Sequence, residues 1–488
     1  MKIIIENTRI VLSNLDIDKE EFRKFKNRFG KYDEVYHNYT YHLFKDLGSG
    51  KFVIPRYYYL GSITNRYNIE EIIDKSKKNP KIKIVKIELK KGFKCRDQLQ
   101  IDAFAFLEQT ILYKSKNVML NLRTGSGKTF LGIKLITFLK FKTLIILDKL
   151  DLLEQWIDKI LEFTELDKKE IKTLTGTPKL LDSIDNPDKY KNIKIFLTTY
   201  KSLSTILEKD FSFLKNFQKT FDIGLKICDE VHKEIKGLFT IDAANSIPYN
   251  LYLTATPARS DSKEDKLLSY ILPFKYSFGR GIDKNIFHKI LLISYNSYPN
   301  QEILESIEND KRGFNVIKYC KYISDKKFTL FSKLIIDLLT QLYINGQKKT
   351  FILFWTLDLI EKIEVDIRKS FPDITIGKFI GSVKKNERKS QLNNQLVLCT
   401  DKIFQTGIDV KDIEILINTF PMSSKVLTEQ ILGRLRENEK NSIYVDINDN
   451  GFPKTKNQRY SRMQVFNKFA KKIYELDYDI KKRKKIIG

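Results

Sequence analysis

The strongest chemical signal in the sequence is the stretch Asn121 to Thr129, which reads Asn-Leu-Arg-Thr-Gly-Ser-Gly-Lys-Thr. Apolar residues on both sides predict a strand before it and a helix after it. Its glycines allow the backbone to close around phosphate groups, with N–H groups pointing inward at the positive end of the helix. Lys128 can then reach the β- and γ-phosphates, and the Thr129 hydroxyl can ligate Mg²⁺. The expected nucleotide-binding residues are Thr124, Gly125, Ser126, Gly127, Lys128 and Thr129. An ordinary glycine-rich turn is the alternative that this motif alone leaves open.

Two adjacent carboxylates form the second signal, because Asp229-Glu230-Val231-His232 follows an apolar run that ends at Cys228. An Asp at the end of a strand can hold Mg²⁺, and the adjacent Glu can orient and deprotonate an attacking water. Such pairs also occur in surface loops, but a position directly after a buried strand favours a catalytic site. We expect Asp229 to hold the metal with Thr129, and Glu230 to be catalytic with Lys128.

Arginines near the C-terminus supply the third signal, within Gln430-Ile431-Leu432-Gly433-Arg434-Leu435-Arg436. If this stretch lies at a helix start in a second sheet domain, Arg434 or Arg436 can reach a γ-phosphate held by the first domain.

Alternating apolar runs and helical stretches must position these residues. After the glycine loop, short apolar runs of buried character are separated by helical stretches such as Lys149 to Phe163, which is typical of a doubly wound parallel sheet. Ligands of such sheets bind beyond the carboxyl ends of the strands. The stretches Thr198–Tyr200 and Thr254–Thr256 are therefore well placed. The expected strands are Thr143–Leu147, Ile193–Thr198, Leu225–Cys228 and Leu251–Leu253.

A second α/β series follows a less regular stretch, and its pattern predicts a second parallel sheet. Its expected elements are the helices Leu330–Tyr343 and Asp358–Ser370 and the strands Thr350–Trp355, Ile374–Ile380, Val397–Thr400 and Ile413–Asn418. The predicted organisation is a small α+β domain over residues 1–90, a first sheet domain over 91–275, a connection over 276–327, and a second sheet domain over 328–488.

The composition favours a polyanionic partner, since 87 basic and 61 acidic residues give a formal charge of +26. An AT-rich genome, which favours lysine codons, explains this charge equally well. Four scattered cysteines without a C-x-x-C pair indicate neither a zinc site nor a disulfide framework, so we expect a reducing compartment. Neither a signal peptide nor an apolar run of membrane-spanning length is present, so we expect a soluble, cytoplasmic protein.

Residues 1–90 carry no recognisable chemistry. Alternation in Ile3 to Leu12 and the aromatic run from Phe52 to Leu60 predict short strands around a charged helix, Lys19 to Phe29. Arg56 with Tyr57, Tyr58 and Tyr59 can stack on bases, but aromatic residues in a strand more often form part of a core.

Taken together, these stretches resemble the superfamily 2 helicases of the D-E-x-H type, from residue 96 to about 437. By that resemblance, motif I is Thr124 to Thr129, Ia is Leu147 to Leu153, Ib is Thr198 to Tyr200, II is Asp229 to His232, III is Thr254 to Thr256, IV is Phe351 to Trp355, V comprises Thr400, Gly407 and Asp409, and VI is Gln430 to Arg436. The resemblance implies two tandem RecA-like domains that close on ATP and Mg²⁺ while nucleic acid crosses both.

The resemblance also implies roles for individual residues. Arg434 and Gln430 join the catalytic set, while Arg96, Gly407, Asp409 and Arg436 are expected to bind the nucleotide. Residues expected to couple hydrolysis to nucleic acid, or to bind it, are His232, Thr199, Thr254, Thr256 and Thr400.

Within the superfamily the chain is similar to the viral and phage branch, which includes the phage UvsW helicase and the poxviral helicase that releases transcripts. The sequence also departs from the family pattern. Leu122 replaces a small residue, Asp148-Lys149 stands where Pro-Thr is common, and Arg436 lies one residue closer to Arg434 than usual. Gln98 and Gln100 straddle the position of the expected adenine-recognising glutamine.

The sequence therefore predicts an ATP-dependent helicase or translocase with a monomeric core. Its expected partner is nucleic acid, with DNA favoured over RNA by the resemblance, and viral transcription or replication machinery is a further candidate. A duplex translocase that does not unwind, an RNA helicase, and a catalytically weak structural subunit of a transcription complex are the alternatives.

Overall fold

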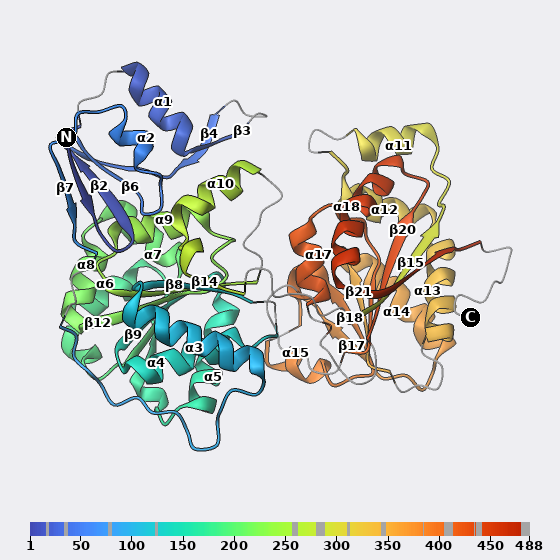
Figure 1. Cartoon of the computed structure of the whole chain (residues 1–488). Helices are drawn as coiled ribbons and strands as arrows, with labels where there is room; N and C mark the ends of the chain where they lie inside the picture. The colour runs from blue at the N-terminus through green and yellow to red at the C-terminus, as the bar shows by residue number, and fades with distance from the viewer. Residues whose placement is uncertain are drawn as a thin grey trace. The chain divides into compact units, whose positions relative to one another are not determined.

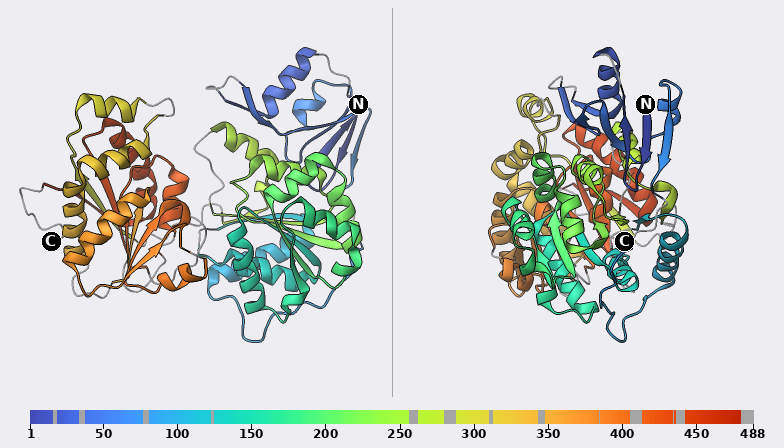
Figure 2. Two further views of the ribbon diagram at one scale, coloured as in Figure 1. Left: turned by 180° about the vertical axis from the view of Figure 1, so that it is seen from behind. Right: turned by 90° about the vertical axis from the view of Figure 1, so that its left-hand side faces the viewer.

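The computed structural model describes residues 1–15, 19–33, 38–76, 81–122, 125–255, 262–279, 288–309, 313–342, 348–383, 385–404, 413–433, 435 and 442–479. The chain divides into two compact units, Met1–Ile282 and Asp283–Gly488. Each unit contains a parallel sheet covered by helices on both faces (Figures 1 and 2). The predicted fold class, two tandem RecA-like domains with a small N-terminal α+β domain, is confirmed.

The first parallel sheet has seven strands in the order β10-β11-β9-β12-β13-β8-β14. Every pairing in it is parallel, and the predicted apolar runs are strands of this sheet. The strands are β8 (Asn117–Asn121), β9 (Lys142–Leu147), β10 (Ile171–Thr173), β11 (Ile195–Thr199), β12 (Ile223–Cys228), β13 (Tyr249–Thr254) and β14 (Ser277–Phe278).

Crossover helices cover both faces of this sheet, because parallel neighbours cannot be joined by a tight turn. On one face lie α3 (Gln98–Tyr113), α4 (Lys128–Leu139) and α5 (Leu150–Phe163), and on the other α7 (Tyr200–Lys209), α8 (Phe213–Phe221) and α9 (Ile235–Ala244) (Figure 1). Successive strand residues face opposite sides. Ile145 and Leu147 therefore lie in the core beneath α3, α4 and α5, whereas Leu144 and Ile146 lie in the core beneath α7, α8 and α9.

The N-terminal domain is built on a mixed sheet in the order β5-β6-β2-β1-β7, in which β1 and β7 are parallel and the other pairs antiparallel. Its strands are β1 (Lys2–Ile5), β2 (Arg9–Ser13), β5 (Lys45–Gly48), β6 (Lys51–Pro55) and β7 (Glu71–Asp74). Beside them lie α1 (Lys19–Phe29), α2 (Gly61–Thr64) and the hairpin of β3 (Gly30–Asp33) and β4 (Asn38–His42).

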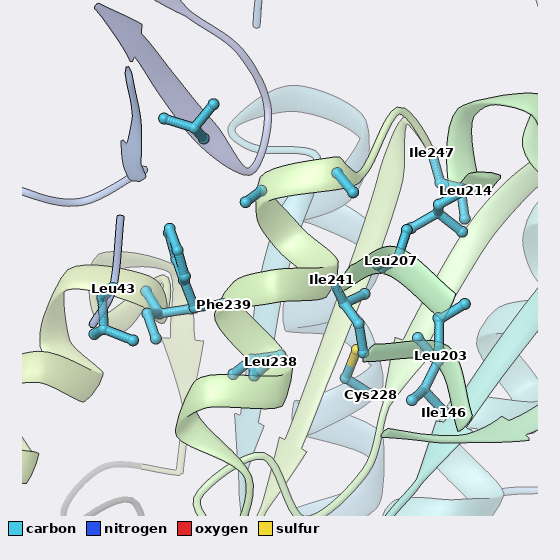
Figure 3. Packing of buried hydrophobic residues seen from close by; sticks show 14 of the residues in the cluster. Leu43, Ile146, Leu203, Leu207, Leu214, Cys228, Leu238, Phe239, Ile241 and Ile247 are labelled. Atoms are coloured by element: carbon cyan, nitrogen blue, oxygen red, sulfur yellow. The ribbon is translucent and has the colours of Figure 1, made fainter. Parts of the chain in front are cut away.

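The core of the N-terminal domain is continuous with one core of the first parallel sheet. Figure 3 shows Leu43 beside Phe239 of α9, and both side chains are buried in one cluster. The aromatic residues after β6 lie in different environments. Tyr58 is buried in this cluster, whereas Tyr59 is 73% exposed. The N-terminal domain is thus packed on the first sheet domain through a shared apolar interior.

The second parallel sheet has the order β17-β18-β16-β19-β20-β15-β21, again with every pairing parallel. Its strands are β15 (His288–Tyr295), β16 (Thr350–Phe354), β17 (Ile376–Phe379), β18 (Leu396–Thr400), β19 (Ile415–Asn418), β20 (Ile443–Asp449) and β21 (Ala470–Asp477). Its helices are α11 (Gln301–Glu308), α12 (Val316–Lys326), α13 (Phe328–Leu342), α14 (Leu357–Ser370), α15 (Lys385–Gln391), α16 (Asp401–Phe404), α17 (Lys425–Leu432) and α18 (Pro453–Phe469).

The stretch 276–327, which we expected to connect the sheet domains, differs from that expectation. Its strand β15 pairs with both β20 and β21 inside the second sheet, and α11 and α12 follow it. The apolar run from Ile290 to Ile293 is buried throughout, as a strand with neighbours on both sides requires. The second sheet domain therefore includes residues that we had placed outside it.

Candidate active site

The glycine loop joins β8 to α4 with the backbone geometry that phosphate binding needs. Gly125 and Gly127 have φ angles of 84° and 85°, in the left-handed region that favours glycine. Gly127 is the N-cap of α4. A Cβ atom added at Gly127 would lie 2.2 Å from Gln100 Nε2, so the Gln100 side chain would have to give up its position against the loop. The loop therefore leads directly into the N-terminus of α4, the positive end of the helix, which favours an anion.

Arg96 and Gln100 brace this loop from the start of α3. Gln100 Nε2 donates to the Ser126 carbonyl at 3.0 Å, and its Oε1 accepts from the Arg96 N–H at 3.0 Å. Arg96 Nη2 donates to the Gly125 carbonyl at 2.8 Å. Gln98 instead donates to Asp102 Oδ1 on the exposed side of the helix. Of the two candidate glutamines, Gln100 is thus the one that touches the loop.

Lys128 is held at the mouth of the loop by a backbone carbonyl. Its Nζ donates to the Leu122 oxygen at 2.7 Å, and the residue is 9% exposed. Leu122 itself is buried in the core between the sheet and α3, α4 and α5. The larger side chain at this position, which departs from the family pattern, is therefore accommodated by packing.

Asp229 lies at the end of β12 in a buried polar environment. Trp156 Nε1 donates to its Oδ2 at 3.0 Å, and the Glu230 N–H donates to its Oδ1 at 2.9 Å. Burial, followed by the neighbouring Glu230 charge, raises the pKa of Asp229 to about 6, while the Lys128 ammonium and Trp156 act in the opposite direction. Tyr200, in the stretch expected as motif Ib, donates its hydroxyl to the Asp229 carbonyl at 3.0 Å, whereas Trp156 is a neighbour of Asp229 that the motifs did not reveal.

Glu230 and His232 connect the carboxylate pair to the next strand. Glu230 has a φ of 50°, a left-handed conformation that is uncommon for this residue type and marks local strain. Glu230 Oε2 lies 3.4 Å from His232 Nδ1, which lies 2.9 Å from Thr254 Oγ1 at the end of β13. His232 and Thr254 are buried. The chain Glu230, His232 and Thr254 therefore links two strand ends at the carboxyl edge of the sheet.

The oxygen donors at this edge fit a magnesium ion that arrives with a nucleotide. Asp229 supplies a buried carboxylate and Thr129 a hydroxyl, and Mg²⁺ takes few protein ligands when phosphates and water complete its shell. Within the described ranges, no cluster of three His, Cys, Asp or Glu side chains could hold a metal by itself.

A buried ion pair supports the carboxylate pair from inside the sheet. Lys226 of β12 pairs with Asp242 of α9, and both are at most 1% exposed. Tyr252 donates to the other Asp242 oxygen at 3.0 Å. The N-terminal domain reaches the same helix, because Thr8 Oγ1 donates to the Asp242 carbonyl at 2.8 Å and Arg9 donates to the Ala243 carbonyl. The helix that follows His232 is therefore held at its end by the N-terminal domain.

In the remaining motifs, the structure places residues at strand ends and helix caps. Thr199 caps α7 by accepting from the Ser202 N–H at 3.1 Å, and Thr400 ends β18.

The expected helix start at Gln430 is wrong, because α17 spans Lys425–Leu432 and Gln430 lies in its last turn. Ser424, which caps α17, is the start signal that was overlooked. Thr124, Thr256, Gly407, Asp409, Arg434 and Arg436 lie outside the described residues.

The fold and this edge define a class: an ATPase with a glycine phosphate loop and a following Asp-Glu pair in a parallel sheet, joined to a second parallel-sheet domain. Comparison with known proteins agrees. Residues 93–259 match the family described as Type III restriction enzyme, res subunit.

Viral and cellular helicases are among the relatives. Candidate helicase 161L of Invertebrate iridescent virus 6 is 24% identical over 73% of this chain and 78% of its own length. Candidate ATP-dependent RNA helicase L396 of Acanthamoeba polyphaga mimivirus is 24% identical over 70% of this chain and 62% of its own length. DNA 3'-5' translocase XPB2 of Sulfurisphaera tokodaii is 30% identical over 33% of this chain, which spans 32% of that protein.

A solved structure shows the same fold. The ATP-dependent Type ISP restriction-modification enzyme LlaBIII bound to DNA matches 84% of this chain and 33% of its own, with a TM-score of 0.54 and 15% identity. The motifs, fold and relatives together support an ATP-hydrolysing enzyme that is similar to superfamily 2 helicases, and its relatives include viral and XPB-type helicases. None of the helices in the described ranges combines the length and hydropathy that crossing a membrane requires.

Proposed function

We propose that this chain couples ATP hydrolysis to movement along nucleic acid, and that it remodels DNA in viral replication, recombination or transcription. One observation supports this most directly. The Leu122 N–H donates to the Thr254 carbonyl at 3.1 Å and the Val231 N–H donates to the Leu253 carbonyl at 3.2 Å, so the phosphate loop and the Asp229–His232 segment both contact the end of β13 at one edge of the sheet. That edge is where an open parallel sheet binds its ligand.

Each residue at this edge has a chemical task in hydrolysis of the bond between the β- and γ-phosphates. Magnesium-bound ATP supplies the phosphoanhydride and, through the metal, part of the charge neutralisation. Lys128 neutralises phosphate charge, and Thr129 and Asp229 hold the metal. Glu230 orients the attacking water and accepts its proton.

The remaining roles in this proposal are assigned to residues of the second domain. Arg434 is assigned to stabilise the charge that develops on the transferred phosphoryl group, Gln430 to the catalytic set, and Arg436, Gly407 and Asp409 to the nucleotide-binding set. Thr124 and the Arg96-braced loop complete the set on the first domain.

Coupling to nucleic acid is assigned to the residues beyond the catalytic pair. His232 lies between Glu230 and Thr254. We infer that a change at the γ-phosphate moves Glu230 and is transmitted through His232 to the end of β13. We assign Thr254 and Thr256 with His232 to this coupling. Thr199 and Thr400, at strand ends in the two sheets, are assigned to the phosphate backbone of the bound strand.

We favour DNA as the substrate, although the names of the relatives include both DNA and RNA. The name of XPB2 describes a DNA translocase, and that of L396 describes an RNA helicase. Phosphate contacts alone carry no base code. We place the protein in the host cytoplasm or a viral factory, as a monomeric core that acts with transcription or replication machinery, and packaging in the virion is consistent with that role.

The test is ATPase activity measured at one salt concentration with single-stranded DNA, duplex DNA, branched DNA and RNA, beside a strand-displacement assay. We expect stimulation by DNA, and displacement of a branched strand. Stimulation without displacement of any duplex would favour a translocase that does not unwind, as the name of XPB2 suggests. Lys128→Ala and Glu230→Gln should abolish both activities. Activity unchanged in both variants, or absent from the wild type, would reject the enzymatic proposal.

A further inference from the structure

A cavity lies at the edge of the first sheet opposite the phosphate loop, where the parallel strands begin. It has a volume of about 430 Å³ and opens between the N-terminal domain and the first sheet domain. Asn117, the first residue of β8, lines it, whereas the phosphate loop follows the last residue of that strand. The cavity is therefore separate from the ATP site.

The walls of the cavity are tied together by hydrogen bonds between the two domains. Asn117 Nδ2 donates to the Tyr57 hydroxyl at 3.1 Å and to the Asn7 carbonyl. Its Oδ1 accepts from Asn250 Nδ2 at 2.9 Å inside the sheet. Lys116 Nζ donates to the Ser76 carbonyl at 3.1 Å. Side chains that are already ordered in this way lose little entropy when a ligand binds.

The charged groups that line the cavity are predominantly cationic: Arg56, Lys114 and Lys116 against Asp74. Arg56 Cζ lies 5.6 Å from the centre of the Tyr57 ring. Within the described ranges, the Arg56 guanidinium and the Tyr249 hydroxyl have no hydrogen-bond partner, so their donors remain available to a ligand.

Aromatic rings accompany these charges, since Tyr57, Tyr113, Tyr249 and Tyr276 all line the cavity. Tyr113 is 82% exposed at the end of α3 and offers a free ring face. Rings of this kind stack on nucleobases, and a guanidinium recognises phosphate through paired N–H donors. The volume also lies in the range of small-ligand sites.

We propose that this cavity binds a nucleoside monophosphate unit, with the phosphate on Arg56 and Lys114 and the base against tyrosine rings. The unit has two possible sources, a free nucleotide or the 5′-phosphorylated end of a nucleic acid strand. This proposal does not depend on ATP hydrolysis.

The experiment uses the full chain carrying Lys128→Ala, which weakens binding at the phosphate loop. AMP is titrated calorimetrically into this protein and into the same protein with Arg56→Met. We expect AMP to bind the first and to lose about tenfold in affinity, or about 1.4 kcal/mol, in the second. Arg66→Met is the matched control, because Arg66 is exposed on the same domain but does not line the cavity. Lys114→Ala should lower the affinity for AMP as Arg56→Met does. Thermal melting checks that each variant is folded.

A short oligonucleotide with and without a 5′-phosphate separates the two sources. A phosphate-dependent gain in affinity that Arg56→Met removes assigns the site to strand ends, whereas AMP binding without that gain assigns it to free nucleotides. No AMP binding to the Lys128→Ala protein, or equal AMP affinity with and without Arg56→Met, would overturn the proposal. These outcomes are independent of ATPase activity, so failure here leaves the proposed function intact.

Discussion

His232 Nδ1 lies 2.9 Å from Thr254 Oγ1, and this buried contact joins the segment after β12 to the end of β13. The same nitrogen lies 3.4 Å from Glu230 Oε2. A histidine placed between the carboxylate that we propose as catalytic and a neighbouring strand end can transmit the state of the nucleotide site without touching a metal.

Thr254→Val tests this connection, because valine keeps the shape of threonine and removes its hydroxyl. We expect the nucleic-acid-stimulated ATPase rate to fall by more than the basal rate, since His232 loses its partner on β13. Stability should also fall by about 0.5–1.5 kcal/mol, because a buried hydrogen bond is lost. Steady-state kinetics with and without saturating DNA, and chemical denaturation, measure the two effects.

Thr240→Val on α9 is the control, because its hydroxyl donates only to the Lys236 carbonyl of its own helix. Equal losses of basal and stimulated rates in Thr254→Val would contradict the coupling role.

The ion pair of Lys226 and Asp242 predicts a large change in stability. Lys226→Met leaves a buried carboxylate without its partner, which costs about 3–5 kcal/mol. Burial already raises the pKa of Asp242, and Lys226 opposes that shift. Without Lys226 the carboxyl should hold its proton to higher pH, so the destabilisation should shrink as pH falls. Urea denaturation at several pH values measures this.

The double variant Lys226→Met with Asp242→Asn should recover much of the lost stability, because both buried charges are removed. A single Lys226→Met variant as stable as the wild type at alkaline pH would show that the pair does not act as described.

The raised pKa of Asp229 implies that this carboxylate lowers the stability of the protein while it serves the proposed activity. Its pKa is raised from 3.8 to about 6, so the folded protein holds this proton more tightly than the unfolded chain does. The contribution of Asp229 to the free energy of unfolding is therefore full below the ordinary pKa and declines as pH rises towards 6. Asp229→Asn should raise the melting temperature of the metal-free protein, by an increment that grows over this interval and then levels off, while ATPase activity is lost.

Melting curves from about pH 4.5 to about pH 7.5 check the shape of this increment. Asp188→Asn, at an exposed position, should leave the melting temperature almost unchanged. An Asp229→Asn increment that is independent of pH would mean that burial of this carboxylate does not oppose its charge.

The glycine loop predicts that two similar substitutions have different consequences. Gly127→Ala adds a Cβ atom that clashes with Gln100 Nε2 at 2.2 Å, so nucleotide affinity should fall by at least about tenfold. Gly92 has a φ of 95° but nothing within 4 Å of an added Cβ. Both variants should lose about 1–2 kcal/mol of stability through backbone strain, because both glycines have a positive φ. Gly92→Ala should nevertheless keep full nucleotide affinity.

Fluorescent nucleotide titration and thermal melting distinguish the two variants. If Gly127→Ala bound nucleotide as tightly as Gly92→Ala, the packing of Gln100 against the loop would have no role in shaping it.

Local patterns were sufficient to predict most of the fold. The strands around Ile145, Leu197, Ile227 and Leu251 are continuous apolar runs, and such runs are characteristic of parallel strands buried on both faces. The glycine loop was equally readable, because backbone conformations with positive φ impose glycine at particular positions. The place of β15 in the second sheet could not be predicted locally, since its neighbours β20 and β21 follow it by more than a hundred residues.

The sequence by itself determined the chemistry of this protein: a phosphate loop ending in Lys128 and Thr129, and the carboxylates Asp229 and Glu230 after a buried strand. Only the tertiary structure decided which groups act on them. It selected Gln100 over Gln98 as the brace of the loop, and it brought Trp156 to Asp229. Such contacts join residues far apart in the chain, and their partners are chosen by packing and burial, which leave no local pattern in the sequence.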